Sequence, residues 1–236
     1  MNGLLSSLNS SDFLKAAITT VWLTLAAQAV GVIGGAILLP FRVSRRRWLR
    51  AAASAYLLIF RGTPELLQLI AWYAILPLAG VELNLVEIAI IGLGANEVAR
   101  MVELLRSALL AVDEGQREAA KVVGLSRAKS MVYVIAPQAA RAAVAGLGNE
   151  VNIMFKTTAL VSVIGMTDLL RQSQLVAQTV SNPLGPYVAA LIYYLALTTA
   201  WGAFQGQIFR QTQLTTRKPG FLVSWWGALS GRLQEG

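Results

Sequence analysis

The chain has 236 residues, of which 56% are hydrophobic and only 14% are charged, and its mean hydropathy is +0.57. These values are unusual for a soluble globular domain and predict an integral membrane protein. The net charge of +8 is typical of a chain whose basic loops face the cytoplasm and its anionic lipids. Nucleic-acid binding is the rival interpretation, but the basic residues are scattered among membrane-length apolar runs rather than gathered on one polar domain.

The sequence contains no Cys and no His, which removes thiolate nucleophiles, Cys-based metal sites, the commonest general base and the commonest metal ligand. An enzyme that works within the membrane is therefore disfavoured. The phosphate-binding pattern G-x-x-x-x-G-K-[ST] is also absent. If the protein performs ATP-driven work, a partner must bind the nucleotide.

The first apolar run, Ala16–Phe41, carries no charge and would reach roughly 39 Å as a helix, which is enough to cross a bilayer with tilt. We therefore predict a span at about 13–40, with a buried helix of a soluble core as the alternative. The residues before it lack a basic region and a cleavage site, so a removable signal peptide is not expected. Three glycines within the run would let a neighbouring helix approach closely: Gly31, Gly34 and Gly35.

The segment 42–50 contains five arginines and an interfacial Trp, which predicts a cytoplasmic position for it and an external N-terminus. The apolar stretch Ala51–Phe60 is too short to span, and we expect it to be an interfacial helix. Pro64 disfavours helical angles at Thr63, so a turn follows, and Glu65 opens a second span at about 65–80.

A third helix is predicted at about 85–110, and it is unusually charged. Its ionisable residues are Glu87, Glu97, Arg100, Glu103 and Arg106. A spacing of three residues from Glu97 to Arg106 places each charge beside an opposite one, which predicts a ladder of structural ion pairs. The alternative is that Glu97, Arg100 and Glu103 face a water-filled path and contact a charged substrate.

The most polar long segment is 115–137, within a predicted cytoplasmic loop 111–138. Asp113 is a plausible N-cap of a short helix, and Gly124 can adopt the left-handed conformation that ends it. A second helix is expected to begin at Ser126. Basic residues keep this loop cytoplasmic: Arg117, Lys121, Arg127, Lys129 and Arg141.

The fourth span is predicted at about 142–170 although polar residues interrupt it, and the fifth at about 187–209, after an external turn at 182–186. The interrupting residues are Asn149, Glu150, Asn152 and Lys156. The sequence thus predicts an all-α, polytopic membrane protein: one domain at 1–220 with about five transmembrane helices, and a tail at 221–236 that contains Trp225 and Trp226. The basic residues after the last span place the C-terminus inside. No internal repeat is present, which disfavours transporters built from inverted repeats.

Three sequence blocks resemble the membrane-spanning permease subunits of bacterial ATP-binding-cassette (ABC) importers, specifically the polar amino acid and opine group. The first block is Arg61-Gly62-Thr63-Pro64 with Leu66, Leu67 and Gln68. The second is Gly115-Gln116-x-Glu118-Ala119-Ala120-x-x-x-Gly124, followed by Pro137 and Gln138 in register. The third is Lys156-Thr157-Thr158-Ala159-Leu160-Val161-Ser162-Val163-Ile164. The resemblance covers about 13–210 and implies the type I importer permease fold.

Two departures from the family pattern stand out. Ala136 replaces a Leu before Pro137, which thins a packing contact. Arg100 stands where a Tyr is common, and this change is chemical because a guanidinium can clamp a carboxylate with two hydrogen bonds. Glu97 and Glu103 could instead receive the cationic end of a basic amino acid.

The resemblance implies a mechanism in which two permeases form the pathway in the inner membrane, two ATPase subunits bind ATP and Mg²⁺, and an extracytoplasmic binding protein delivers the substrate. This chain itself would be no enzyme and would hold no cofactor. The ATPase-coupling residues implied are Gly115, Glu118, Ala119, Ala120 and Gly124. The second permease could be another copy or a different chain. A secondary transporter driven by an ion gradient is the alternative function.

Overall fold

The computed structural model describes residues 2–214, and every regular element in that range is helical. The elements in chain order are α1 (Asn2–Leu8), α2 (Ser11–Arg42), α3 (Arg47–Gly62), α4 (Glu65–Leu78), α5 (Leu85–Leu110), α6 (Glu114–Val122), α7 (Arg127–Ser130), the π-helical turn η1 (Met131–Ile135), α8 (Ala136–Thr157), the 3₁₀ helix η2 (Thr158–Ile164), α9 (Leu169–Ala177) and α10 (Leu184–Leu214). The predicted all-α class is confirmed. The predicted tail, 221–236, lies outside the described residues.

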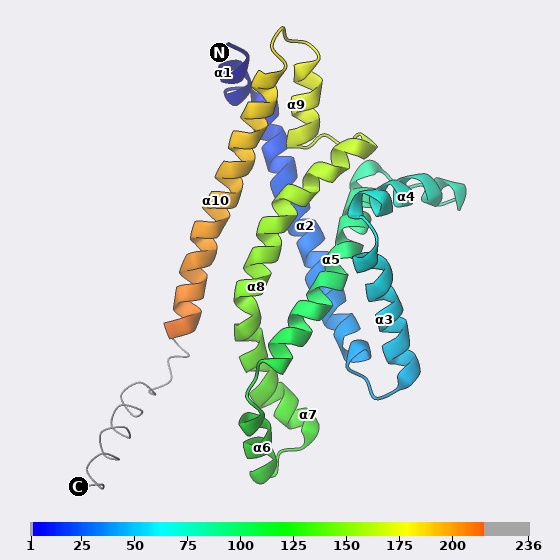
Figure 1. The fold of residues 1–236 in the computed structure, drawn as a ribbon, viewed down its shortest axis with the longest axis vertical. Coiled ribbons are helices and arrows are strands. Elements are labelled where there is room, and N and C mark those ends of the chain that lie inside the picture. Colours follow the sequence, from blue (N-terminus) through cyan, green and yellow to red (C-terminus); the bar gives the residue numbers. More distant parts are fainter. Residues whose placement is uncertain (1, 215–236) are drawn as a thin grey trace, which may run out of the picture.

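Helices α2 and α5 run side by side in the same direction and form the centre of the molecule (Figure 1). Their backbones approach closely at the predicted glycines. A Cβ atom at Gly35 would lie 2.5 Å from the Cβ of Met101, and one at Gly31 would collide with the side chain of Glu97. Small residues are the usual means by which membrane helices gain van der Waals contact, so the glycines of α2 determine how deeply α5 packs.

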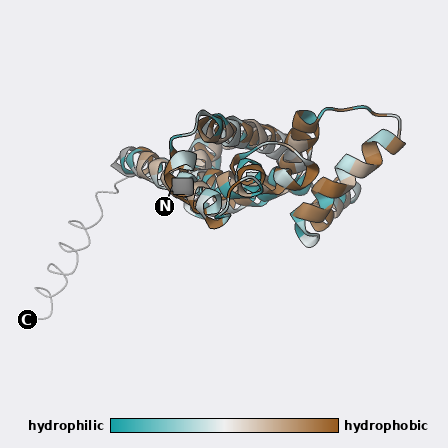
Figure 2. Cartoon of the chain, turned by 90° about the horizontal axis from the view of Figure 1, so that it is seen from above, coloured by the Kyte–Doolittle hydropathy of each residue, from teal (hydrophilic) through white to brown (hydrophobic). Residues whose placement is uncertain are grey.

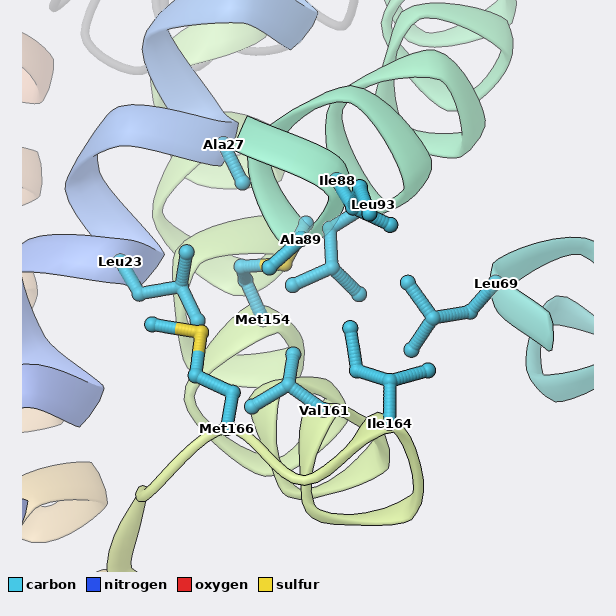
Figure 3. Packing of buried hydrophobic residues seen from close by; sticks show 10 residues of the cluster. All are labelled: Leu23, Ala27, Leu69, Ile88, Ala89, Leu93, Met154, Val161, Ile164 and Met166. Atoms are coloured by element: carbon cyan, nitrogen blue, oxygen red, sulfur yellow. The ribbon is translucent and has the colours of Figure 1, made fainter. Parts of the chain in front are cut away.

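The largest apolar cluster joins α2, α4, α5, α8 and η2 (Figure 3). Its buried members are Leu23, Ala27, Leu69, Ile88, Ala89, Leu93, Met154, Val161, Ile164 and Met166. Val161 and Ile164 belong to the third sequence block, and the figure shows them directed at Leu69 and the α5 residues. About half of the third block is therefore turned into the core, whereas Lys156 and Val163 are exposed.

Many large apolar side chains on the long helices are exposed. Figure 2, seen from above, shows that hydrophobic residues occur along most of these helices. Ile37 of α2 is 63% exposed and Leu191 of α10 is 66% exposed. A soluble protein would hide such stripes, whereas a membrane protein presents them to lipid tails. The surface pattern agrees with the composition.

Three helical segments are long and apolar enough to cross a membrane: Ser11–Arg42, Arg127–Ile164 and Leu184–Arg210. Helix α4 is apolar but shorter, and α5 has the length but carries the charges noted above. A helix is present in each of the five predicted regions. The number of spans and their orientation remain predictions.

The predicted fourth span, 142–170, is wrong in its boundaries. Helix α8 begins earlier, at Ala136, and the helical run ends at Gly165, whose φ of 89° reverses the chain. Asp168 then caps α9 by accepting a hydrogen bond from the Arg171 amide at 2.9 Å. A left-handed glycine followed by an N-cap residue is the local reason that one helix cannot continue to 170.

The segment predicted as an interfacial helix, 51–60, belongs to a longer helix. It lies within α3, which begins at the end where α2 finishes and runs back alongside α2 and α5 (Figure 1). Ala53 and Leu57 are the buried residues of α3, and Leu57 packs with Ala99 and Val102 of α5 and with Leu38 of α2. The segment therefore packs against the bundle as part of α3.

Candidate functional site

The polar stretch 115–137 forms a compact helical hairpin at one end of the molecule, beyond the ends of α2, α5 and α8 (Figure 1). Asp113 is the N-cap of α6, as predicted, and its carboxylate accepts a hydrogen bond from the Gly115 amide at 2.7 Å. The cap satisfies a backbone donor that would otherwise lack a partner at the start of so short a helix.

Gly124 ends α6 with a φ of 77°, which confirms the predicted left-handed conformation. Its amide donates to the Lys121 carbonyl at 3.0 Å, and the Leu125 amide donates to the Ala120 carbonyl at 3.0 Å. This pair of bonds is the Schellman motif. Ser126 then opens α7, also as predicted, so the loop has a fixed shape before any partner binds.

The hairpin presents a mixed surface. Glu118 and Ala119 are exposed, whereas Ala120 is buried against the chain itself and is 3% exposed. Val122 and Val123 are 86% and 73% exposed at the tip. The sequence reasoning missed these two valines, although an apolar pair directly before the helix-ending glycine of a polar loop was the available signal.

Hydrogen bonds tie α6 to the two long helices that flank it in sequence. The guanidinium of Arg117 donates to the carbonyl of Leu109 in α5 at 2.8 Å. The side-chain amide of Gln138 in α8 donates to that of Gln116 in α6 at 3.2 Å. A displacement of α6 would therefore be transmitted to both α5 and α8.

The first sequence block forms the joint between α3 and α4, and Gln68 is its centre. The Gln68 amide donates to the carbonyls of Phe60 and Thr63 at 3.2 and 3.0 Å, which satisfies acceptors at the end of α3. Its oxygen accepts a hydrogen bond from Asn96 of α5 at 2.9 Å. The block thus fixes the angle between α3 and α4 and attaches it to α5.

Arg100 of α5 forms ion pairs with two other helices rather than with its own. It contacts Glu65 at the start of α4 and lies 3.8 Å from Glu150 of α8. The predicted pairs of Arg100 with Glu97 and Glu103 are wrong, because the side chain points across the bundle instead of along the helix. Glu65 and Glu150 are partners that a one-helix spacing argument could not supply.

Glu97 lies one turn away and is fully buried where α5 meets α2. Gln28 of α2 is its polar neighbour, but neither carboxylate oxygen of Glu97 accepts a hydrogen bond of good geometry from a described residue. Elsewhere among the described residues, the Thr24 hydroxyl, the Gln28 oxygen and one Glu150 oxygen are likewise buried without a hydrogen-bond partner. Buried acceptors without donors are costly, so Glu97 with its neighbours Gln28 and Glu150 has the character of a functional site.

Glu103 belongs to a separate group of charges nearer the hairpin. Its carboxylate lies 3.2 Å from the Arg42 guanidinium of α2 and 3.6 Å from that of Arg106. The predicted Glu103–Arg106 pair is therefore confirmed. Among the described residues, no group of three or more acidic, His or Cys side chains is placed to hold a metal ion.

Comparison with protein families identifies a match over residues 31–213 to the family described as "Binding-protein-dependent transport system inner membrane component". The chain belongs to this family. Its match includes all three sequence blocks and both charged groups of α5. The protein is thus an inner-membrane permease subunit of an ABC importer, and permeases of this kind work with ATPase subunits and a binding protein.

Individual relatives agree with the family. The arginine transport system permease protein ArgU of Corynebacterium glutamicum is 34% identical over 92% of this chain and 75% of its own length. The octopine transport system permease protein OccQ of Agrobacterium tumefaciens is 30% identical over 84% of this chain and 87% of its own. A solved amino acid ABC transporter crystallised with histidines is 33% identical, with a TM-score of 0.81 over 85% of this chain and 94% of its own.

Proposed function

We propose that this permease forms the membrane pathway for uptake of polar or charged amino acids or opines, driven by ATP hydrolysis in a separate subunit. The observation that carries the proposal is a group of ionisable side chains within the bundle: Arg100 of α5 pairs with Glu65 of α4 and Glu150 of α8, and Glu97 is buried one turn away where α5 meets α2. Ionisable residues within membrane helices are costly and usually mark the path of a substrate. The names of the amino acid and opine relatives support the substrate class.

Arg100 is the residue that we assign to substrate contact, together with Glu97. The Arg100 side chain keeps 22% of its surface exposed, so it is reachable from the space between the helices, and its guanidinium can hold a carboxylate. Glu97 has no exposed surface in this conformation, so it would be reached only after α2 and α5 rearrange. Glu103 was the third candidate, but two arginines already hold its carboxylate.

The hairpin of α6 is proposed as the ATPase-coupling element. Glu118 and Ala119 are exposed, so a carboxylate and a small side chain are available to a groove in the ATPase. Gly115, Ala120 and Gly124 instead hold the helix in place, through the cap at its start, burial against the chain and the turn at its end. ATP and Mg²⁺ would be bound by the partner, and no cofactor by this chain. Movement of the ATPase subunits would then tilt α5 and α8 through Arg117 and Gln138, a rigid-body switch.

The test is uptake by proteoliposomes that contain the permease pair and its ATPase, with the binding protein added outside. We expect accumulation of a basic or polar amino acid that requires internal ATP and continues without any ion gradient. Accumulation that follows a proton or sodium gradient in vesicles without nucleotide would instead establish a secondary transporter. Identification of the subunits in the purified complex would decide whether the second permease is another copy of this chain.

The variant Glu118→Lys tests the coupling assignment within the same assay. We expect it to weaken ATPase co-purification and to reduce ATP-driven uptake. Glu82→Lys is the matched control, because it makes the same charge change in the exposed turn before α5, at the other end of that helix. Equal effects of the two variants, or no effect of either, would overturn the assignment of α6.

A further inference from the structure

A cavity of about 390 Å³ lies where α2, α3, α5 and α6 come together, at the end of the molecule that carries the hairpin. Four arginines line it, one from each helix: Arg42, Arg50, Arg106 and Arg117. No acidic side chain of the described residues lines this cavity. A concave site lined by arginines from four different elements is suited to an oxyanion, because a guanidinium offers two parallel donors.

The local charges do not cancel. Arg42 and Arg106 share the single carboxylate of Glu103, at 3.2 and 3.6 Å. Arg117 is paired with Glu114 at 3.2 Å, and Glu114 is itself largely exposed. Arg50 has no acidic partner within the part of the chain that the structure describes. Four guanidinium groups therefore face two carboxylates, which leaves the cavity positively charged.

The cavity also has an apolar wall. Val43, Leu110 and Met131 line it, and Leu110 and Val43 are 67% and 52% exposed. Trp48, the second residue of α3, is 66% exposed at the same end of the molecule, and Trp side chains favour the interface between lipid and water. A free inorganic anion gains nothing from apolar neighbours, whereas a phospholipid brings glycerol and acyl carbons next to its phosphate.

We propose that this cavity binds the phosphate of an anionic phospholipid from the cytoplasmic leaflet. Basic pockets between membrane helices on the cytoplasmic side are suited to such headgroups. A free phosphate offers the same oxyanion chemistry, and the apolar wall favours the lipid. The inference rests on the proposed cytoplasmic orientation of the hairpin but not on the transported substrate. Because Arg117 belongs to α6, a bound lipid would also touch the coupling hairpin.

The test uses the full-length permease purified with its ATPase in a neutral detergent. Native mass spectrometry measures the retention of added phosphatidylglycerol or phosphatidylcholine, each with and without millimolar inorganic phosphate. Arg50→Gln removes the unpaired arginine of the cavity. Arg47→Gln is the matched control, because it removes the same charge from the same helix at an exposed position outside the cavity.

We expect the protein to retain phosphatidylglycerol in preference to phosphatidylcholine. Retention of phosphatidylglycerol should be about fivefold weaker in Arg50→Gln, the factor that corresponds to ~1 kcal/mol for one basic residue near the membrane surface. It should be unchanged in Arg47→Gln. Leu110→Glu should cause a similar loss, and its exposed position means that the substitution should not disturb folding. Equal retention of both lipids, or equal losses in Arg47→Gln and Arg50→Gln, would overturn the site. Displacement of the lipid by inorganic phosphate would assign the cavity to the free anion and overturn the lipid proposal.

Discussion

Replacing Arg100 with Gln should destabilise the protein, because it removes the cation that lies between α4 and α8. Glu65 and Glu150 would both lose their partner while retaining only 27% and 18% side-chain exposure. Breaking a buried ion pair costs about 3–5 kcal/mol, and a fully exposed pair contributes about 0–1 kcal/mol. For these partly buried carboxylates we expect a loss of about 2 kcal/mol in the free energy of unfolding, measured in detergent.

The double variant Glu65→Gln/Arg100→Gln separates the structural role of Arg100 from a role in transport. It removes one of the two uncompensated carboxylates, so it should recover about half of the lost stability. If Arg100 contacts substrate, uptake by the reconstituted importer should remain low in the double variant even though stability recovers. Recovery of uptake together with stability would show that the ion pair is only structural.

One result would refute the bridging role of Arg100 directly. If Arg100→Gln has the same free energy of unfolding as the unmodified protein, then the contacts of Arg100 with Glu65 and Glu150 contribute nothing measurable to stability. Glu103→Gln is a useful comparison, because it removes a carboxylate from the separate group with Arg42 and Arg106 and should leave substrate selectivity unchanged.

Three further substitutions test the packing and the caps, each by thermal unfolding of the purified protein. Gly35→Leu should disrupt the contact of α2 with α5 and lower the yield of folded protein. Its control, Gly202→Leu, lies at a site with no described neighbour within 4 Å and should be tolerated. Equal effects of the two variants would contradict the close approach of α2 and α5. Tyr194→Phe should cost about 1 kcal/mol, because it removes a 2.8 Å hydrogen bond to buried Asp168; no change would mean that the bond is compensated. Gly124→Ala should cost about 1–2 kcal/mol because φ is 77°, and a neutral result would mean that the loop is not held in this conformation.

The local chemistry of the hairpin could be predicted from the sequence because it is set by near neighbours. The cap at Asp113, the left-handed Gly124 and the helix start at Ser126 each depend on residues within a few positions. The close approach at Gly31 was also predictable, because glycine weakens a helix and is favoured in an apolar one where a neighbouring helix must come near. These features follow from backbone conformation and side-chain size.

The partners of Arg100 could not be predicted, because they come from helices whose relative rotation no local spacing determines. The i,i+3 rule places Glu97 and Glu103 beside Arg100, but the structure directs the guanidinium to Glu65 and Glu150. The predicted end of the fourth span was wrong for a different reason. Gly165 was not recognised as a turn within an apolar run that composition alone extends to 170.

The central claim is that the α6 hairpin meets an ATP-binding subunit, and cross-linking tests it most directly because the chain has no native cysteine. A single Ala119→Cys substitution at the exposed face of α6 should cross-link to the ATPase in the assembled importer, with a yield that changes when ATP is added. A Cys at exposed Leu184, at the start of α10, should give no such product. Cross-linking to the ATPase from Leu184→Cys but not from Ala119→Cys would contradict the account.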